Sequence, residues 1–164
     1  MKYFVGLVAA CAVTVAGVHA RAQEAVVGAP NPDSLFKNAD PKLNVNTQAA
    51  YHIVKDLLEA GHWELAGKYL TPEYHQHNPN AKSGRDGVVA YFTQVLKVQP
   101  KPIPEKMATP VVAVLAQGDY VVVVNPRVLK DAKDSTNSYT TTWFDMWRFK
   151  DGRADEHWDP AIKN

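Results

Sequence analysis

The chain has 164 residues, of which 46% are hydrophobic and 21% charged, with 18 Lys and Arg against 17 Asp and Glu. These values fit one ordinary globular domain, and they exclude a disordered chain and a nucleic-acid-binding protein with a basic stripe. The single cysteine, Cys11, excludes a disulfide scaffold and a thiolate zinc site. Aromatic residues are plentiful enough for a core or an aromatic pocket, with four Trp, seven Tyr and five Phe.

Residues 1–22 have the features of a secretory signal peptide. Lys2 precedes an apolar run over residues 3–18, and residues 18–22 offer small-x-small cleavage sites. A membrane anchor is the weaker alternative, because the run is near the lower limit of about 17–25 residues for a spanning helix. A lipoprotein box is disfavoured, because Cys11 lies too early in the run. We therefore expect a bacterial periplasmic or secreted protein that has no membrane contact after cleavage.

Helical patterns occupy the first half of the mature chain. Residues 23–45 contain three prolines and no periodicity, so we expect an extended lead-in there. Asn46 is the candidate N-cap of a first helix that ends at Gly61. A short second helix should run from Trp63 to Leu70. The apolar residues of the first helix recur at helical spacing: Ala50, Ile53, Val54, Leu57 and Leu58.

A third helix is predicted to begin at Ser83. Ser83 and Asp86 have the spacing of a capping box, and apolar residues recur at helical spacing from Val88 to Leu96. The segment Gly84-Arg85-Asp86-Gly87 lacks the Lys and Ser/Thr of a phosphate-binding loop, so we interpret it as a helix start.

The second half of the chain is typical of an antiparallel sheet. Residues 111–116 and 120–124 flank Gln117-Gly118-Asp119, and residues 139–149 and 153–158 flank Asp151-Gly152, which predicts two hairpins. Helices followed by strands indicate an α+β domain with the helices on one sheet face. The first hairpin shows little polar alternation, so both sheet faces should be covered. A partner subunit would cover the second face, and we therefore expect a homodimer.

The register of the last hairpin decides which side chains share a face. A two-residue turn pairs Asp145 with Trp158, whereas a three-residue loop pairs Asp145 with His157. We choose the three-residue loop, because Lys150-Asp151-Gly152 suits it. One face then carries Trp143, Asp145, Trp147, Asp155, His157 and Asp159.

Carboxylates and an imidazole among indoles favour a pocket, although a structural ion-pair cluster or a surface trio at a strand end would also contain them. Burial beside tryptophan raises a carboxyl pKa and a neighbouring imidazolium lowers it, so such a pocket can separate an acid from a base. A second polar segment, residues 74–79, contains His75 and His77 on one side of an extended chain. No third or fourth ligand has motif spacing, so we predict no metal. We expect His77 and Asn78 to bind a ligand; a structural turn histidine is the alternative for His77.

Four segments occur in a characteristic order: Tyr74-His75-Gln76-His77-Asn78-Pro79, Gly84-Arg85-Asp86-Gly87, Ala116-Gln117-Gly118-Asp119-Tyr120-Val121, and the run from Phe144 to Asp159. Together they resemble the SnoaL-like (polyketide cyclase-like) branch of the nuclear transport factor 2-like superfamily. The resemblance defines a cavity domain over residues 46–164. It implies a cone-shaped α+β fold, in which a curved, mostly antiparallel sheet and about three N-terminal helices enclose a cavity, and it implies a dimer.

The resemblance also implies roles for single residues. Asp159 matches the acid/base of polyketide cyclases, which close a ring by intramolecular aldol condensation without metal or organic cofactor. Asp145 matches a polar cavity residue of those enzymes, and His77 matches a histidine often placed at the cavity. The export signal departs from the family pattern, because polyketide cyclisation is normally cytoplasmic.

We therefore expect an exported acid–base enzyme that acts without a cofactor on a small, apolar or aromatic carbonyl compound, as a cyclase, isomerase or dehydratase. Asp159 would be the base, and His157, Asp145 or His77 would orient it or donate a proton. Trp143 and Trp147 would contact the ligand, together with Asn78. The alternative is a non-catalytic periplasmic ligand-binding protein or a dimeric accessory module.

Overall fold

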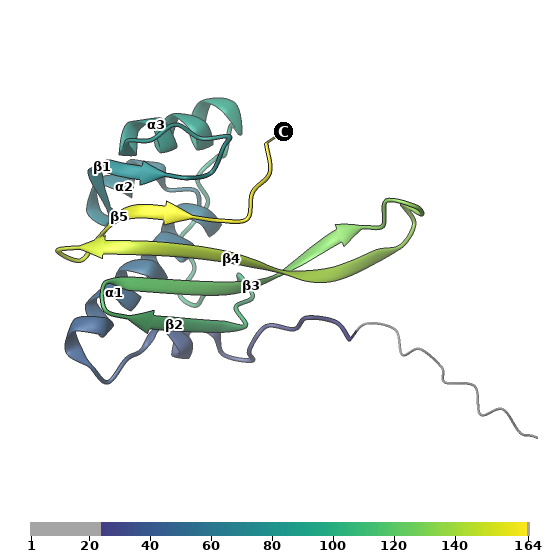
Figure 1. Cartoon of the computed structure of the whole chain (residues 1–164), viewed down its shortest axis with the longest axis horizontal. Helices are drawn as coiled ribbons and strands as arrows, with labels where there is room; N and C mark the ends of the chain where they lie inside the picture. The colour runs from purple at the N-terminus through teal and green to yellow at the C-terminus, as the bar shows by residue number, and fades with distance from the viewer. Residues whose placement is uncertain (1–23, 164) are drawn as a thin grey trace, which may run out of the picture.

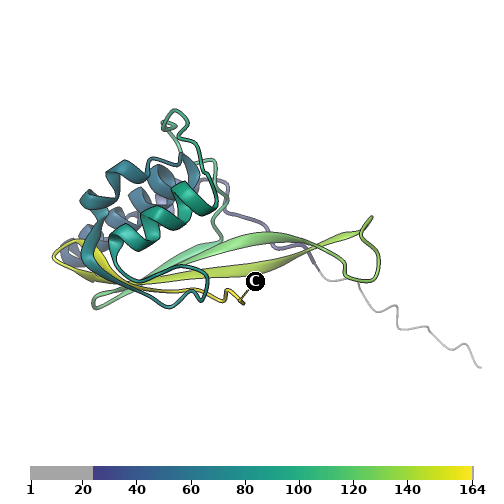
Figure 2. The ribbon, with the colours of Figure 1, turned by 90° about the horizontal axis from the view of Figure 1, so that it is seen from above.

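The computed structural model describes residues 24–163, so the predicted signal peptide lies outside the described residues. A layer of helices covers one face of a five-stranded sheet, and none of the helices in residues 24–163 lies on the other face (Figures 1 and 2). The sheet is curved and does not close on itself. Within residues 24–163, no helix has the length and apolar character that a membrane span requires. The predicted α+β class, with helices on one sheet face, is confirmed.

The first helix begins earlier than the sequence predicts. A 3-10 turn, η1 (Pro32–Phe36), precedes α1 (Pro41–His52), which continues into a π-helical segment, η2 (Ile53–Glu59). The Asp40 side chain caps α1, because it accepts hydrogen bonds from the amides of Lys42 (2.8 Å) and Leu43 (3.1 Å). Asn46, the predicted cap, is a buried residue inside α1. The predicted helix start is too late because Pro41 was assigned to the extended lead-in, whereas proline is also common at the first position of a helix.

The second and third helices lie where the sequence predicts them. The short 3-10 turn η3 (Trp63–Leu65) leads into α2 (Ala66–Tyr69), and α3 (Arg85–Ala90) continues as the π-helical η4 (Tyr91–Val95). The predicted capping box is wrong, because Gly84 is the N-cap and no side chain caps α3. Ser83 instead accepts a hydrogen bond from the amide of Gln76 at 3.0 Å, which ties the start of α3 to the end of the first strand.

The sheet has the strand order β1-β5-β4-β3-β2. The three pairings among the last four strands are antiparallel, as predicted, and β1 pairs with β5 in parallel. The sequence does not predict β1, because a parallel strand pairs with a distant segment and has no hairpin signal. The strands are β1 (Leu70–Gln76), β2 (Ala113–Gln117), β3 (Tyr120–Lys130), β4 (Ser138–Lys150) and β5 (Arg153–Trp158).

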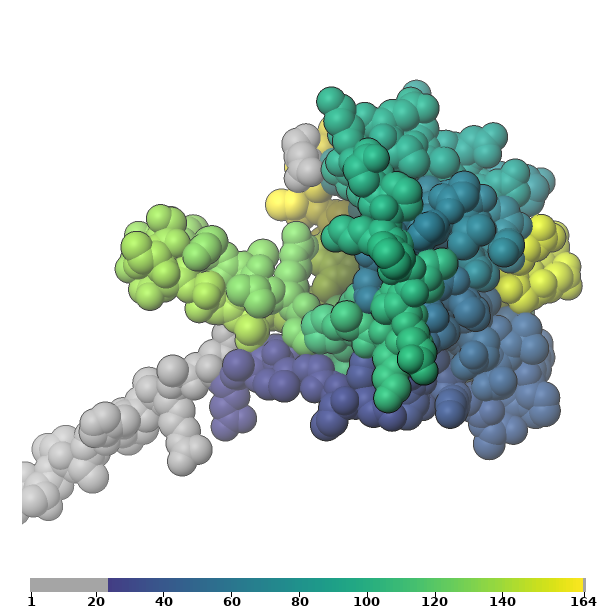
Figure 3. Space-filling model, turned by 180° about the vertical axis from the view of Figure 1, so that it is seen from behind, coloured from purple at the N-terminus to yellow at the C-terminus, as the bar shows by residue number. Residues whose placement is uncertain are grey.

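The β3–β4 hairpin extends beyond the rest of the sheet and projects from the body as an arm (Figures 1 and 3). β3 continues six residues past Val124, its predicted end, to Lys130, although Pro126 lies within it. Beyond Val124, β3 pairs only with β4, because β2 begins at Ala113 opposite Val124. Proline is compatible with a strand that has a free edge, since its missing amide needs no partner there.

The turn between β4 and β5 differs from the prediction. Lys150 pairs with Arg153, and both turn residues have positive φ (Asp151 51°, Gly152 71°), as in a two-residue type I′ turn. The pairing then shifts at a bulge that leaves Asp155 without a partner in the ladder, so that Trp147 pairs with His157. The extra residue brings His157 back to the face of Asp145 and Trp147, which is the predicted face.

Asp155 itself lies apart from that face, which corrects its predicted position. Its carboxylate accepts hydrogen bonds from Arg148 (2.8 Å) and from the Thr71 hydroxyl (3.1 Å). Burial acts to raise the pKa of Asp155, but these hydrogen bonds prevail and hold the pKa below its usual value. The ionised Asp155 side chain therefore binds the bulge to both β4 and β1.

The hydrophobic core lies between the helices and the inner face of the sheet. Phe36 and Leu57 from the helical layer, and Val121 and Val123 from β3, are fully buried. The predicted apolar stripe of the first helix is in this core, apart from Leu58, which is 39% exposed. Burial of these side chains supplies the main stabilisation of a domain without a disulfide.

Replacement of Asp40 by alanine tests the revised helix start. Asp40→Ala removes the acceptor of two backbone amides at the N-terminus of α1, so we expect a loss of about 1 kcal/mol in the free energy of unfolding, measured by urea denaturation. Asp86→Ala is the control, because the Asp86 side chain is 97% exposed and does not cap α3. Equal stability losses in the two variants would contradict the capping assignment.

Candidate functional site

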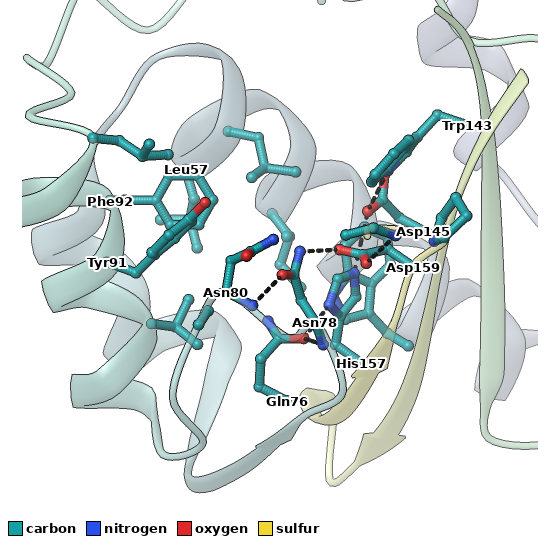
Figure 4. Close-up of a pocket in the computed structure, with 18 of the residues that line it drawn as sticks. Leu57, Gln76, Asn78, Asn80, Tyr91, Phe92, Trp143, Asp145, His157 and Asp159 are labelled. Carbon is teal, nitrogen blue, oxygen red and sulfur yellow. Dashed lines mark hydrogen bonds and ion pairs between the residues drawn. The ribbon is translucent and has the colours of Figure 1, made fainter. Parts of the chain in front are cut away.

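A cavity of about 580 Å³ lies between the helical layer and the inner face of the sheet. It opens between the helices and the base of the β3–β4 arm (Figure 3). Its two walls differ in character: Leu57, Tyr91 and Phe92 from the helices form an apolar wall, and polar side chains from the strands face it (Figure 4). A cavity of this size, mostly apolar with a few converging polar groups, is typical of a small-molecule site.

Asp145, His157 and Asp159 meet at the polar wall. Asp145 comes from β4, His157 from β5, and Asp159 follows the end of β5. The ligating atoms of the three side chains lie within 4.8 Å of one another, and His157 Nε2 is 3.1 Å from Asp145 Oδ1. The His157 side chain is only 8% exposed. The three residues predicted to be catalytic are therefore neighbours in the structure.

Gln76 determines the protonation of one His157 nitrogen. The Gln76 Oε1 atom accepts a hydrogen bond from the amide of Asn78 (2.9 Å), which identifies that atom as the oxygen of the side-chain amide. His157 Nδ1 lies 2.9 Å from the same oxygen. Since a carbonyl oxygen only accepts, Nδ1 carries a proton and donates it. The Nε2 atom is thereby left to face the cavity and Asp145.

His157 and Asp145 lie within hydrogen-bond distance of each other. The Oδ1 atom of Asp145 also accepts a hydrogen bond from the indole of Trp143 at 3.2 Å, because an indole nitrogen can only donate. The separation of 3.1 Å between Nε2 and Oδ1 is a hydrogen-bond distance, in which one of the two atoms donates and the other accepts. The pair can therefore deliver a proton to a ligand in the cavity.

Asp159 is held by a chain of amide groups (Figure 4). The backbone amide of Asn80 donates to Asn78 Oδ1 (2.9 Å), which turns the Asn78 amino group toward Asp159 Oδ2 at 2.8 Å. The amide of Ala161 donates to the other carboxylate oxygen at 3.0 Å. Each oxygen of Asp159 therefore has one donor and keeps lone-pair capacity for a proton from a ligand.

Two buried aromatic residues hold His157 in place. Trp147 stacks against the imidazole with the ring centroids 5.2 Å apart, and its indole donates to the Tyr74 hydroxyl at 3.1 Å. Burial raises the pKa of Tyr74, so its hydroxyl stays protonated at neutral pH and is not an acid there. Tyr74 and Trp147 are therefore supports of the imidazole.

The structure places six of the seven predicted site residues at the cavity: Asn78, Trp143, Asp145, Trp147, His157 and Asp159. His77 is the exception, which corrects its predicted position. Because side chains alternate along a strand and Gln76 faces inward beside His157, His77 points to the opposite face. There it lies 2.8 Å from Glu156 and stacks on Trp158, with 5.0 Å between ring centroids.

Several lining residues were missed by the sequence reasoning. Gln76 and Asn80 belong to the polar wall, and Arg127 lines the cavity from β3. The alternation of Tyr74, Gln76 and Asn78 is the signal that would have identified Gln76, provided that the segment is recognised as a strand. Arg127 had no such signal, because it lies beyond Val124, the end of the predicted strand.

Asp145, His157 and Asp159 together form the set of donor groups that a divalent cation can use. Both carboxylates and Nε2 already have hydrogen-bond partners, and a cation would displace the proton between Nε2 and Oδ1. A proton and a divalent cation would therefore compete for the same atoms of the trio.

The sequence matches the SnoaL-like domain family over residues 51–157, and no curated protein matches it. Among solved structures, the chain is similar to a proposed SnoaL-like polyketide cyclase from Jannaschia sp. CCS1, with a TM-score of 0.52 and 16% identity over 76% of this chain and 91% of that chain. It is also similar to a proposed polyketide cyclase from Acidithiobacillus ferrooxidans, with a TM-score of 0.51 and 15% identity over 75% and 89% of the two chains.

A third similar structure is a nuclear transport factor 2-like protein of unknown function from Burkholderia pseudomallei. Its TM-score is 0.50, with 20% identity over 72% of this chain and 91% of that chain. At these identities the likeness shows a common fold and leaves the reaction open.

Addition and removal of divalent cations test the protonated state of the trio. We expect the melting temperature to stay unchanged with MgCl₂, MnCl₂, ZnCl₂ or EDTA. A cation at a hundredfold excess over its dissociation constant would add about 2.7 kcal/mol of stability, which a thermal shift detects readily. A shift in the natural protein that is absent from Asp159→Asn would show instead that the trio binds a metal.

Proposed function

The chain belongs to the SnoaL-like domain family, and from this we propose that it is an acid–base enzyme that acts without a cofactor on a small, mostly apolar carbonyl compound. The observation that carries the proposal is the position of Asp159 next to the hydrogen-bonded His157–Asp145 pair, at the polar wall of an otherwise aromatic cavity. Positioned acid and base groups in such a cavity are what proton transfer at a carbon next to a carbonyl requires.

The proposed first step is removal of a proton from the carbon next to the carbonyl group. A carboxylate oxygen of Asp159 takes the proton, and the electrons of the broken C–H bond form an enolate. The proton between His157 Nε2 and Asp145 Oδ1 passes to the enolate oxygen, which neutralises the developing charge. Asn78 is a positioning residue in this scheme, because it holds Asp159 through one oxygen.

The resulting enol is the common intermediate of the reaction types we consider: ring closure by aldol condensation, isomerisation and dehydration. The helical wall of Leu57, Tyr91 and Phe92 would contact the apolar part of the compound. Trp143 and Trp147 would contact it from the sheet side. Because residues 1–22 have the features of a signal peptide, we propose that the enzyme acts in the periplasm or outside the cell.

We also propose that the protein is a homodimer that pairs through the outer face of the sheet. Leu115, Val122, Met146 and Trp158 form one row across neighbouring strands on this face. Leu115 is 60% exposed and the neighbouring Phe144 is 45% exposed, although both are large apolar side chains. A continuous apolar face without helices is typical of a surface that a partner covers.

The Asp159→Asn variant tests the proposed base. We expect the enzyme to exchange the acidic C–H protons of 2-tetralone for deuterium in D₂O, followed by proton NMR, and the variant to be slower by about 10²–10⁴-fold. Asparagine keeps the shape of the side chain and removes the base. Asp151→Asn is the control, since Asp151 lies in the hairpin turn outside the cavity and asparagine tolerates its positive φ.

Full exchange by Asp159→Asn would overturn the catalytic assignment. Absence of exchange above the buffer rate in the natural protein, with 2-tetralone and with a panel of small apolar ketones and keto acids, would favour the alternative, a non-catalytic ligand-binding protein.

The Leu115→Glu variant tests the proposed dimer. The side chain is exposed in the monomer, so the change should leave folding intact and place a charge in the proposed interface. We expect sedimentation at micromolar concentration to show a dimer for the natural protein and a monomer for the variant. Val95→Glu is the control, because Val95 is 67% exposed on the helical side. A monomeric natural protein would contradict the proposal.

A further inference from the structure

Arg127 is the only Lys or Arg side chain among the described residues that line the cavity. It lies on β3 at the base of the β3–β4 arm, and it pairs with Thr141 across the hairpin. Its guanidinium lies over the indole of Trp143, 4.2 Å from the ring centroid. Arg127 is therefore the one Lys or Arg cation of the described cavity lining, and it lies at the mouth, whereas neutral and acidic groups lie deeper.

Trp143 holds Arg127 and Asp145 at two different places on one rigid ring. The face of the indole contacts the guanidinium, and the Nε1–H group donates to Asp145 Oδ1 at 3.2 Å. Stacking on an indole covers one face of a guanidinium and leaves the N–H groups along its edge available. Within residues 24–163, the guanidinium of Arg127 contacts the ring of Trp143, and no carboxylate forms an ion pair with it.

We propose that Arg127 binds the carboxylate group of an organic acid, and that the ligand of this cavity is therefore a mono-anionic compound with an apolar or aromatic body. A guanidinium edge matches a carboxylate through two parallel hydrogen bonds, which a neutral ester or amide cannot form. The inference deepens the proposed function, since it names the substrate class, but binding at Arg127 requires no turnover.

The Asp159 carboxylate of the polar wall gives such a ligand one orientation. Among the described residues, Asp159 has only neutral donors and repels an anionic group, so the carboxylate of the ligand is excluded from the deep end and accepted at the mouth. Arg127 is also shared with a neighbouring hollow of about 400 Å³, together with Leu58, Trp143 and Asp145. The guanidinium is thus accessible from the solvent side, where an anion arrives.

A pair of probes that differ only in charge tests the proposal. Cinnamate and cinnamamide have the same aromatic body, and both should quench the fluorescence of the cavity tryptophans, Trp63, Trp143 and Trp147. We expect the natural protein to bind cinnamate about ten- to a hundredfold more tightly than cinnamamide. Arg127→Gln should remove this preference and leave the affinity for cinnamamide unchanged, and Arg127→Lys should restore only part of it.

Lys130→Gln is the matched control, because Lys130 is an exposed cation on the same strand whose side chain does not line the cavity. It should keep the preference for cinnamate. Equal affinity of the natural protein for both probes, an unchanged affinity of Arg127→Gln for cinnamate, or failure of cinnamate to bind at millimolar concentration would each overturn the proposal.

The Asp159→Asn variant separates this proposal from the proposed function. It removes a negative charge from the cavity and leaves Arg127 in place, so its affinity for cinnamate should be equal to or higher than that of the natural protein. If the protein shows no deuterium exchange but still prefers cinnamate through Arg127, the proposed anion site stands and only the catalytic proposal is overturned.

Discussion

The bulge at Asp155 is the constraint on which the polar wall of the cavity depends. Without an extra residue, the two-residue turn after β4 would place His157 and Asp159 on the outer face of the sheet. The ion pair between Asp155 and Arg148, at 2.8 Å, and the hydrogen bond from Thr71 stabilise the bulge from two neighbouring strands. The bulge at Asp155 thus turns the imidazole of His157 and the carboxylate of Asp159 toward Asp145.

The sequence predicted the correct face for the wrong reason. A three-residue loop and a two-residue turn followed by a bulge differ by two positions in register, and a shift of two leaves each side chain on the same face. Asp145, His157 and Asp159 therefore meet as predicted, whereas Asp155, the extra residue, does not join them. Hairpin patterns identify strands well, but a bulge depends on partners such as Thr71 that are distant in the chain.

The other errors have the same origin in non-local contacts. β1 lies beside β5 through a parallel pairing between residues about eighty positions apart in the chain. No local pattern shows that Gln76 is next to His157, and without that pairing His77 looked like a cavity residue and Gln76 did not. The helices were easier to predict, because apolar spacing is a local property. The caps were harder, because Asn46 lies inside α1, which starts at Asp40 and Pro41, and Gly84 precedes α3 in place of the predicted Ser83.

The two walls of the cavity come from different parts of the chain. Residues 53–63 and 88–96 supply the apolar helical wall, and most of the polar groups come from two other short segments, residues 76–80 and 143–159. A substitution at Tyr91 or Phe92 changes the volume open to a ligand without touching a hydrogen bond of the polar wall. Over evolutionary time, a lineage with this architecture can exchange one ligand shape for another by mutation in the helices alone, while the inherited polar wall stays intact.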